Sequence, residues 1–255
     1  MKGAYSIPTT LLTRYTEMNL FPDNTYFFDS GGNPKYITKL SFDELVKFHE
    51  KYYHPSNSKI FVSGVATDVD KMNDTLSTID EYLNEFEENL SVKDQSIVKY
   101  QKKNIEAPIV KSYPYQVTST DGEDNSTSSS SDGQHIIQVS WLINDDPLTP
   151  LQELTLFMLD QLLMSESSIL KKTLLESQLG DYVVGGLSSD MIQQYYSMGL
   201  SGVHEEDVFQ VETLVLDTIQ EVAQKGFTDN EISATINSVE FMVSLSYCFS
   251  NLWID

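Results

Sequence analysis

Hydrophobic and polar residues recur with helical spacing in the first third of the chain. Apolar side chains three and four positions apart predict helices over residues 9–19, 41–54 and 68–90. Between the second and third of these helices lies the run Lys59–Val65, in which most residues are apolar without a helical or an alternating pattern. A short run of this kind, ended by glycine, predicts a buried strand.

Start and stop signals mark two of the helices. Ser41 with Glu44, and Thr228 with Glu231, have the spacing of a capping box, in which each side chain bonds the other residue's backbone N–H. Pro55 ends the helix that begins after Ser41, because the residue before a proline disfavours the α conformation. Both helices are therefore expected to begin at these caps.

The rest of the chain mixes strand and helix patterns. Ile137, Val139 and Trp141 alternate along 135–143 and predict a strand with one buried face. Gly180 is expected to end the helix predicted over 167–178 by adopting the left-handed conformation. The expected elements are strands over 109–113, 135–143, 182–186 and 195–203, and helices over 150–164, 167–178, 205–225 and from 228 onward. Irregular alternation of helices with antiparallel-type strands indicates the α+β class.

Length and local composition suggest two units. At roughly 150 residues per domain, 255 residues fit about two domains. We expect the first at 1–95, a polar linker at 96–108 and the second at 109–255. Within the second, the Ser-rich stretch 119–133 is expected to be a disordered loop, because it has little apolar surface to bury.

Charge and composition exclude several classes of protein. The net charge of −22 opposes binding to the phosphates of nucleic acid. The single cysteine, Cys248, cannot form an internal disulfide or a cysteine-based zinc site. Since no apolar run approaches about 18 residues, no membrane span is expected.

The four histidines are the first candidates for metal chemistry. His49 and His54 lie five positions apart, which turns the second side chain by about 140° around a helix, whereas a helical metal pair needs a spacing of four. We therefore expect both to be structural or surface residues. The same holds for His135, at the start of a strand, and for His204, in a turn before a helix.

Other chemical groups are isolated in the sequence. Asp160 lies within an apolar helix and is either a capped polar group of the core or an interface residue. Neither a nucleophile elbow nor a phosphate-binding loop is found. Taken residue by residue, the chain holds no self-contained active site.

Several segments, in their order along the chain, resemble one family. These segments are Met1–Ser6, Leu20–Tyr26, Asp29–Lys35, Phe48–Asn57, Leu174–Asp181 and Gly199–Val203. They are similar to the presequence-protease branch, which includes the falcilysins, of the pitrilysin/insulinase-type zinc metallopeptidases. The resemblance runs from Met1 to about Phe241.

The resemblance has consequences for activity. These enzymes are inverzincins: a His-x-x-Glu-His helix supplies two zinc ligands and the general base, and a distal glutamate is the third ligand. In this branch that glutamate precedes a Met-Lys-Gly sequence like the one at Met1, so all of these residues are expected upstream of Met1. No catalytic, cofactor-binding or metal-binding residue of the family maps onto this sequence, and no zinc is expected on this chain alone.

The resemblance implies parts of two consecutive peptidase-type domains, each a mainly antiparallel sheet with helices packed on it. Residues 242–255 depart from the family and suggest a truncated end. We expect a fragment of a zinc metalloendopeptidase that degrades unstructured peptides such as targeting presequences, inactive by itself. The alternative is a non-catalytic peptide-binding or partner module of a split or degenerate peptidase. The resemblance further implies the missing family portions as partners and a mitochondrial or plastid location.

Overall fold

The fold is that of a computed structural model, which describes residues 5, 7–63, 68–102, 107–115 and 135–251, with side chains up to residue 244. The chain forms two compact units. Unit 1 comprises residues 1–27 and 100–255, and unit 2 comprises residues 28–99. The expected Ser-rich loop at 119–133 lies outside the described residues. The family domain limits expected from the sequence stay a prediction.

A three-stranded antiparallel sheet is the centre of unit 1. Its strands are β1 (His135–Leu142), β2 (Tyr182–Ser188) and β3 (Tyr195–Val203), in the order β1-β3-β2. The register pairs Val139 with Met198 and Gly185 with the same Met198 from the other side. The sheet with its covering helices confirms the α+β class.

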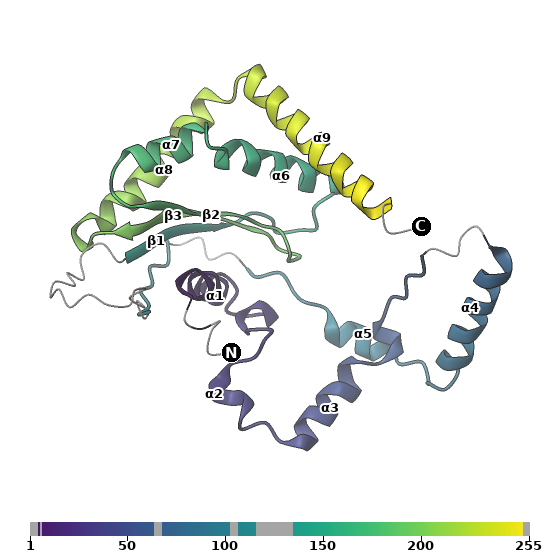
Figure 1. Cartoon of the computed structure of the whole chain (residues 1–255). Helices are drawn as coiled ribbons and strands as arrows, with labels where there is room; N and C mark the ends of the chain where they lie inside the picture. The colour runs from purple at the N-terminus through teal and green to yellow at the C-terminus, as the bar shows by residue number, and fades with distance from the viewer. Residues whose placement is uncertain (1–4, 6, 64–67, 103–106, 116–134, 252–255) are drawn as a thin grey trace, which may run out of the picture. The chain divides into compact units, whose positions relative to one another are not determined.

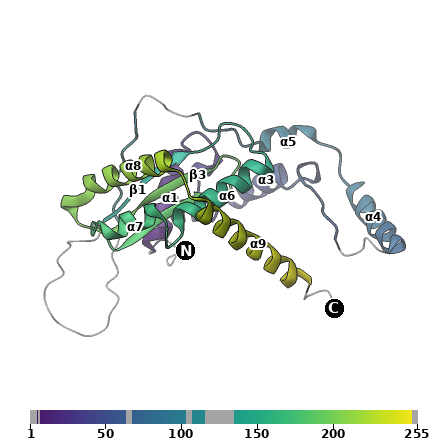
Figure 2. The same cartoon turned by 90° about the horizontal axis from the view of Figure 1, so that it is seen from above.

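Four α-helices of unit 1 come after β1 in the chain, and three of them contact the sheet. They are α6 (Pro150–Met164), α7 (Ile169–Glu176), α8 (Val208–Lys225, after the short η4, Glu205–Asp207) and α9 (Asp229–Asn251). Helices α6 and α7 contact β2, α8 contacts β1 and β3, and α9 packs on α6. Figures 1 and 2 show these helices on one face of the sheet.

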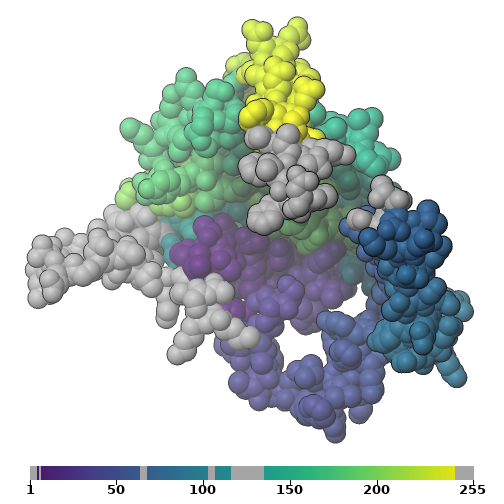
Figure 3. All heavy atoms as spheres, turned by 45° about the vertical axis from the view of Figure 1, so that its right-hand side comes forward, coloured from purple at the N-terminus to yellow at the C-terminus, as the bar shows by residue number. Residues whose placement is uncertain are grey.

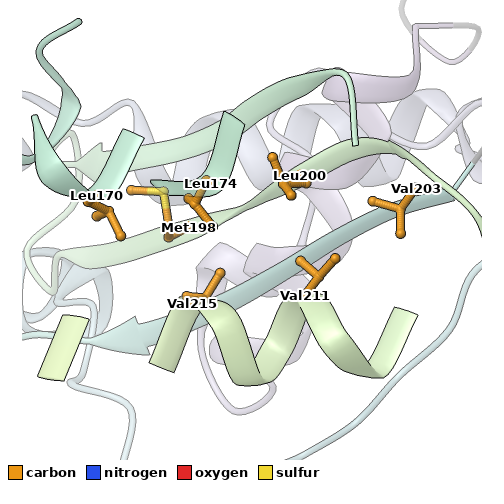
Figure 4. Close-up of a cluster of buried hydrophobic side chains, with 7 residues drawn as sticks. All are labelled: Leu170, Leu174, Met198, Leu200, Val203, Val211 and Val215. Atoms are coloured by element: carbon orange, nitrogen blue, oxygen red, sulfur yellow. The ribbon is translucent and has the colours of Figure 1, made fainter. Parts of the chain in front are cut away.

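The core of unit 1 lies between this helix layer and the sheet. Side chains of α7 and α8 point at the middle strand in Figure 4. As expected, Ile137, Val139 and Trp141 share the face of β1 that packs against this core. The fully buried members of the core are Leu170, Leu174, Met198, Leu200, Val203, Val211 and Val215.

The opposite face of the sheet contacts α1 (Pro8–Leu20) and is partly polar. The Ser140 and Ser197 hydroxyl groups, on neighbouring strands, are 2.9 Å apart, and Gln138 Nε2 donates to Thr16 Oγ1 of α1 at 3.0 Å. Beyond them, the fully buried Phe21 makes an edge contact with Tyr195. Hydrogen bonds between side chains therefore contribute to this interface as well as apolar contacts.

The described residues of unit 2 form helices, turns and extended segments, and none of them pairs as a β-strand. Its elements are α2 (Pro34–Ile37), α3 (Phe42–Tyr52), η3 (Pro55–Asn57), α4 (Val69–Leu83) and α5 (Leu90–Ser96), while η2 (Thr25–Phe27) belongs to unit 1. The capping box is present at the start of α3. The helix expected over 68–90 instead ends at Leu83, and α5 forms a separate helix after the turn at 84–89.

Three local expectations were wrong. Residues 59–63 and 109–113 do not form strands, because neither segment pairs with another among the described residues. Tyr113 instead stacks on Tyr15 of α1, with ring centroids 4.0 Å apart. After α7, Gln178 and not Gly180 is left-handed, at φ 57°. Gly180 is needed for a different reason, since a Cβ there would lie 2.8 Å from the Ser201 carbonyl oxygen.

Candidate functional site

His49 and His54, the two histidines of the first candidate motif, have separate surroundings. His49 is exposed on α3, where its ring stacks on Tyr53 with centroids 4.8 Å apart. His54 lies beyond the helix end and caps η3, because its Nδ1 accepts the Ser56 backbone N–H at 3.2 Å. That bond occupies the Nδ1 lone pair, and Phe86 makes an edge contact with the same ring.

The remaining candidates lie on other elements. His135 begins β1 opposite Val203, and His204 precedes η4. Cys248 lies in the last part of α9, where only the backbone is described. Within the described part of the chain, no three histidine, cysteine, aspartate or glutamate side chains come together as a metal site would require. The donor set seen there does not fit zinc.

Asp160 is a half-buried carboxylate on α6, and its surroundings favour the role of a capped polar group. From α6, its Oδ1 accepts the backbone N–H of Leu187 on β2 at 3.0 Å. Half-burial raises the pKa of Asp160, while the bonds from Leu187 and Gln161 oppose that shift. The residue therefore links the helix layer to the edge strand β2.

Tyr196 is a neighbouring group that the sequence did not single out. Its hydroxyl is buried and has no hydrogen-bond partner among the described atoms. Burial raises the pKa of Tyr196, and the negative charge of Asp160 raises it further. Both shifts disfavour the phenolate, so Tyr196 is a neutral phenol across the physiological range and cannot serve as a base.

A buried amide network joins distant segments of unit 1. Gln101 Nε2 donates to Asp23 Oδ2 at 2.8 Å, and the Gln101 backbone N–H donates to Gln193 Oε1 at 2.8 Å. Gln193 Nε2 returns a bond to the Gln101 carbonyl at 3.2 Å. Sequence spacing gives no signal for this network, because its members lie 78 and 92 positions apart. Because the members of this network bond one another, we assign it a structural role.

Two further properties concern the described part of the chain and its charge. None of its helices is long and apolar enough to cross a membrane. Its sheet ends in two edge strands, β1 and β2, and the chain as a whole is strongly acidic.

Comparison with known proteins identifies the relatives of this scaffold. A family model described as the peptidase M16 inactive domain matches residues 39–239. Presequence protease 1, chloroplastic/mitochondrial, of Arabidopsis thaliana is 39% identical over 94% of this chain and 21% of its own length. The mouse mitochondrial presequence protease is 32% identical over 94% of this chain and 22% of its own.

Protein HypA of Clostridium perfringens is 30% identical over 94% of the chain and 23% of its own length. The chain therefore spans about a fifth of the length of these relatives. The family match covers more than half of the chain and extends over both units. The chain belongs to the peptidase M16 family and is related within it to the presequence proteases.

Proposed function

We propose that this chain is one part of a zinc metalloendopeptidase that degrades unstructured peptides, and that it is inactive by itself. The observation that carries the proposal is the alignment of nearly the whole chain with presequence proteases that are more than four times longer than the aligned region. A metallopeptidase activates water at its metal, so a chain without the ligands lacks that step.

The peptide class follows from the relatives' names and from charge. Targeting presequences are basic, and a chain of net charge −22 raises the local concentration of cationic peptides by long-range attraction. By the same resemblance, we assign the protein to an organelle of the mitochondrial or plastid type. The expected partners are unstructured peptides and the remaining portions of the peptidase.

The matched family model favours the second candidate function. Because its description is that of an inactive domain, the chain is also a candidate for a non-catalytic peptide-binding or partner module. Under both candidates the chain binds peptide without cleaving it. They differ in whether this chain restores cleavage when it is joined to the rest of a family enzyme.

The deciding experiment uses the chain and a chimera. In the chimera, this chain replaces the aligned region of Arabidopsis presequence protease 1. We expect the chain alone to bind no stoichiometric zinc and to leave a basic, unstructured peptide intact, while the chimera cleaves it in a manner abolished by o-phenanthroline. If the chimera folds and binds zinc but does not cleave the peptide, the peptidase-part function is refuted and the partner-module function is favoured. Chelator-sensitive cleavage by the chain alone would refute both candidate functions.

A further inference from the structure

Strand β2 forms one edge of the sheet, and the ladder shows which of its backbone groups point outward. In an antiparallel sheet, alternate residues of a strand bond to the neighbour on one side, and the residues between them bond to the other side. The Ile143 N–H donates to the Gln194 carbonyl oxygen at 2.9 Å, so every second residue after Gln194, beginning with Tyr196, bonds toward β1. Tyr196 is paired with Leu187 of β2, and the backbone N–H and C=O of Leu187 therefore point away from the sheet.

The outward N–H of Leu187 already has a partner. Asp160 Oδ1, on α6, accepts it at 3.0 Å. Helix α6 belongs to the helix layer, which Figure 3 shows in green to yellow at the surface of unit 1. A strand that added to β2 would need this N–H, because pairing uses the outward donors and acceptors of alternate residues. Asp160 therefore occupies a hydrogen-bonding position of the sheet edge in addition to linking α6 to β2.

Two consecutive glycines bend the edge next to this position. Gly185 has φ 117° and Gly186 has φ 125°, whereas a regular antiparallel strand has φ of about −140°. A Cβ on Gly185 would lie 2.2 Å from the Ser197 carbonyl oxygen, so only glycine fits there. By the same alternation as for Leu187, the outward residues of β2 are Val183, Gly185 and Leu187. The bend takes the middle one out of regular strand geometry, which leaves two positions for pairing, and Asp160 occupies one of them.

A second copy of this chain is the partner that an open β2 edge would accept. Unpaired edge strands are templates for pairing with another chain. Tyr182, at the start of β2, is 70% exposed, so the edge is accessible at that end. The net charge of −22 on each copy repels the other, but salt screens this repulsion beyond about 8 Å at physiological ionic strength. Protection at short range is therefore needed at the edge itself.

We propose that Asp160 blocks the β2 edge against strand pairing and thereby keeps two copies of this chain from associating through it. The bend at Gly185 and Gly186 assists, because the single open position at Val183 cannot hold a strand. This role goes beyond the proposed peptidase function and does not depend on it, since it concerns the sheet and not a reaction.

Removal of the Asp160 carboxylate tests this role. Asp160→Ala frees the Leu187 N–H, whereas Asp160→Asn keeps a side-chain oxygen that can accept the same bond. A symmetric pair of copies uses each edge position twice, so two freed N–H groups should lower the dissociation constant of self-association by roughly 30-fold in Asp160→Ala. Asp160→Asn should behave like the unaltered chain. The measurement is sedimentation velocity over a concentration series in 0.5 M NaCl, where a Debye length of about 4 Å suppresses the charge repulsion.

Hydrogen exchange locates the contact. In the unaltered chain, the N–H of Leu187 should exchange slowly and that of Val183 rapidly, because only the first has a partner. In associated Asp160→Ala, both should be protected, with exchange at Val183 slowed by roughly 100-fold. Adding Tyr182→Lys to Asp160→Ala places a charge at an exposed position of the edge and should restore the monomer.

A matched control separates edge pairing from a loss of stability. Gln138→Ala breaks the bond from β1 to Thr16 of α1, which also joins two elements but lies away from β2. Equal association of Gln138→Ala and Asp160→Ala would overturn the proposal, as would a folded Asp160→Ala that stays as monomeric as the unaltered chain. Association that leaves Val183 unprotected would place the contact elsewhere and refute it too. The unaltered chain provides a test that needs no variant, because equally rapid exchange at Leu187 and Val183 would contradict the block.

Discussion

Leu174 provides a quantitative test of the helix–sheet core in unit 1. Its side chain is fully buried between α7 and the sheet, so Leu174→Ala removes three carbon groups from an apolar site. At about 0.8 kcal/mol per group, transfer alone costs roughly 2.4 kcal/mol, and the cavity left behind raises the total to about 3–5 kcal/mol. Leu151→Ala on α6 is the matched control, because Leu151 is 73% exposed and its loss should cost only about 0.6 kcal/mol.

The assay is urea unfolding followed by tryptophan fluorescence. Trp141 packs against the core and reports on unit 1, and a Trp253→Phe background makes it the only tryptophan. Unit 2 does not contribute to this signal, which keeps the transition specific to the sheet and its helices. If Leu174→Ala costs less than about 1.5 kcal/mol, or no more than Leu151→Ala, the core is not packed as described.

Further predictions concern pH, strand packing and a helix cap. Burial raises the pKa of Asp160, so the folded state keeps this proton to a higher pH than the unfolded chain does. The free energy of unfolding therefore falls as the pH rises from the unfolded pKa to the raised folded pKa. Asp160→Asn should flatten that fall in unfolding curves recorded between pH 3.5 and 7. Gly199→Ala places a Cβ 1.8 Å from the Ile137 carbonyl oxygen and should prevent β1 from pairing with β3, with loss of strand signal in circular dichroism; an unchanged spectrum would contradict the register. Thr228→Ala should cost about 1 kcal/mol in thermal unfolding by breaking the capping box with Glu231, and Thr228→Ser should restore most of it.

Local sequence patterns predicted much of unit 1 because local interactions determine those features. The cap at Thr228 depends on residues three positions apart, and the strand over 135–143 on the alternation of Ile137, Val139 and Trp141. The strand patterns at 182–186 and 195–203, joined by a short connection, correspond to β2 and β3, which pair antiparallel. In each case the tertiary contacts agree with the local preference, which is the condition under which pattern-based prediction succeeds.

The features that were missed depend on distant residues. The network of Gln101 with Asp23 and Gln193 forms only when segments 78 and 92 positions apart meet, and polar residues at those positions otherwise look like surface residues. The strand predicted at 59–65 illustrates the opposite case. Its residues have strand preference, but a strand exists only with a hydrogen-bonded neighbour, and none is present among the described residues.

The contrast between the two units bears on where catalysis can take place. A catalytic constellation must be held to within a fraction of an ångström, which requires side chains fixed by a packed interior. Unit 1 has such an interior, and two of its polar side chains are held by hydrogen bonds within it: Asp160 bonds the backbone of β2, and Gln193 bonds Gln101. Unit 2 carries His49 and His54, yet Val92 is its only buried residue among those described. A rigid framework for positioned side chains is therefore found in unit 1, whereas His49 and His54 lie on a unit whose described residues are nearly all outside a core.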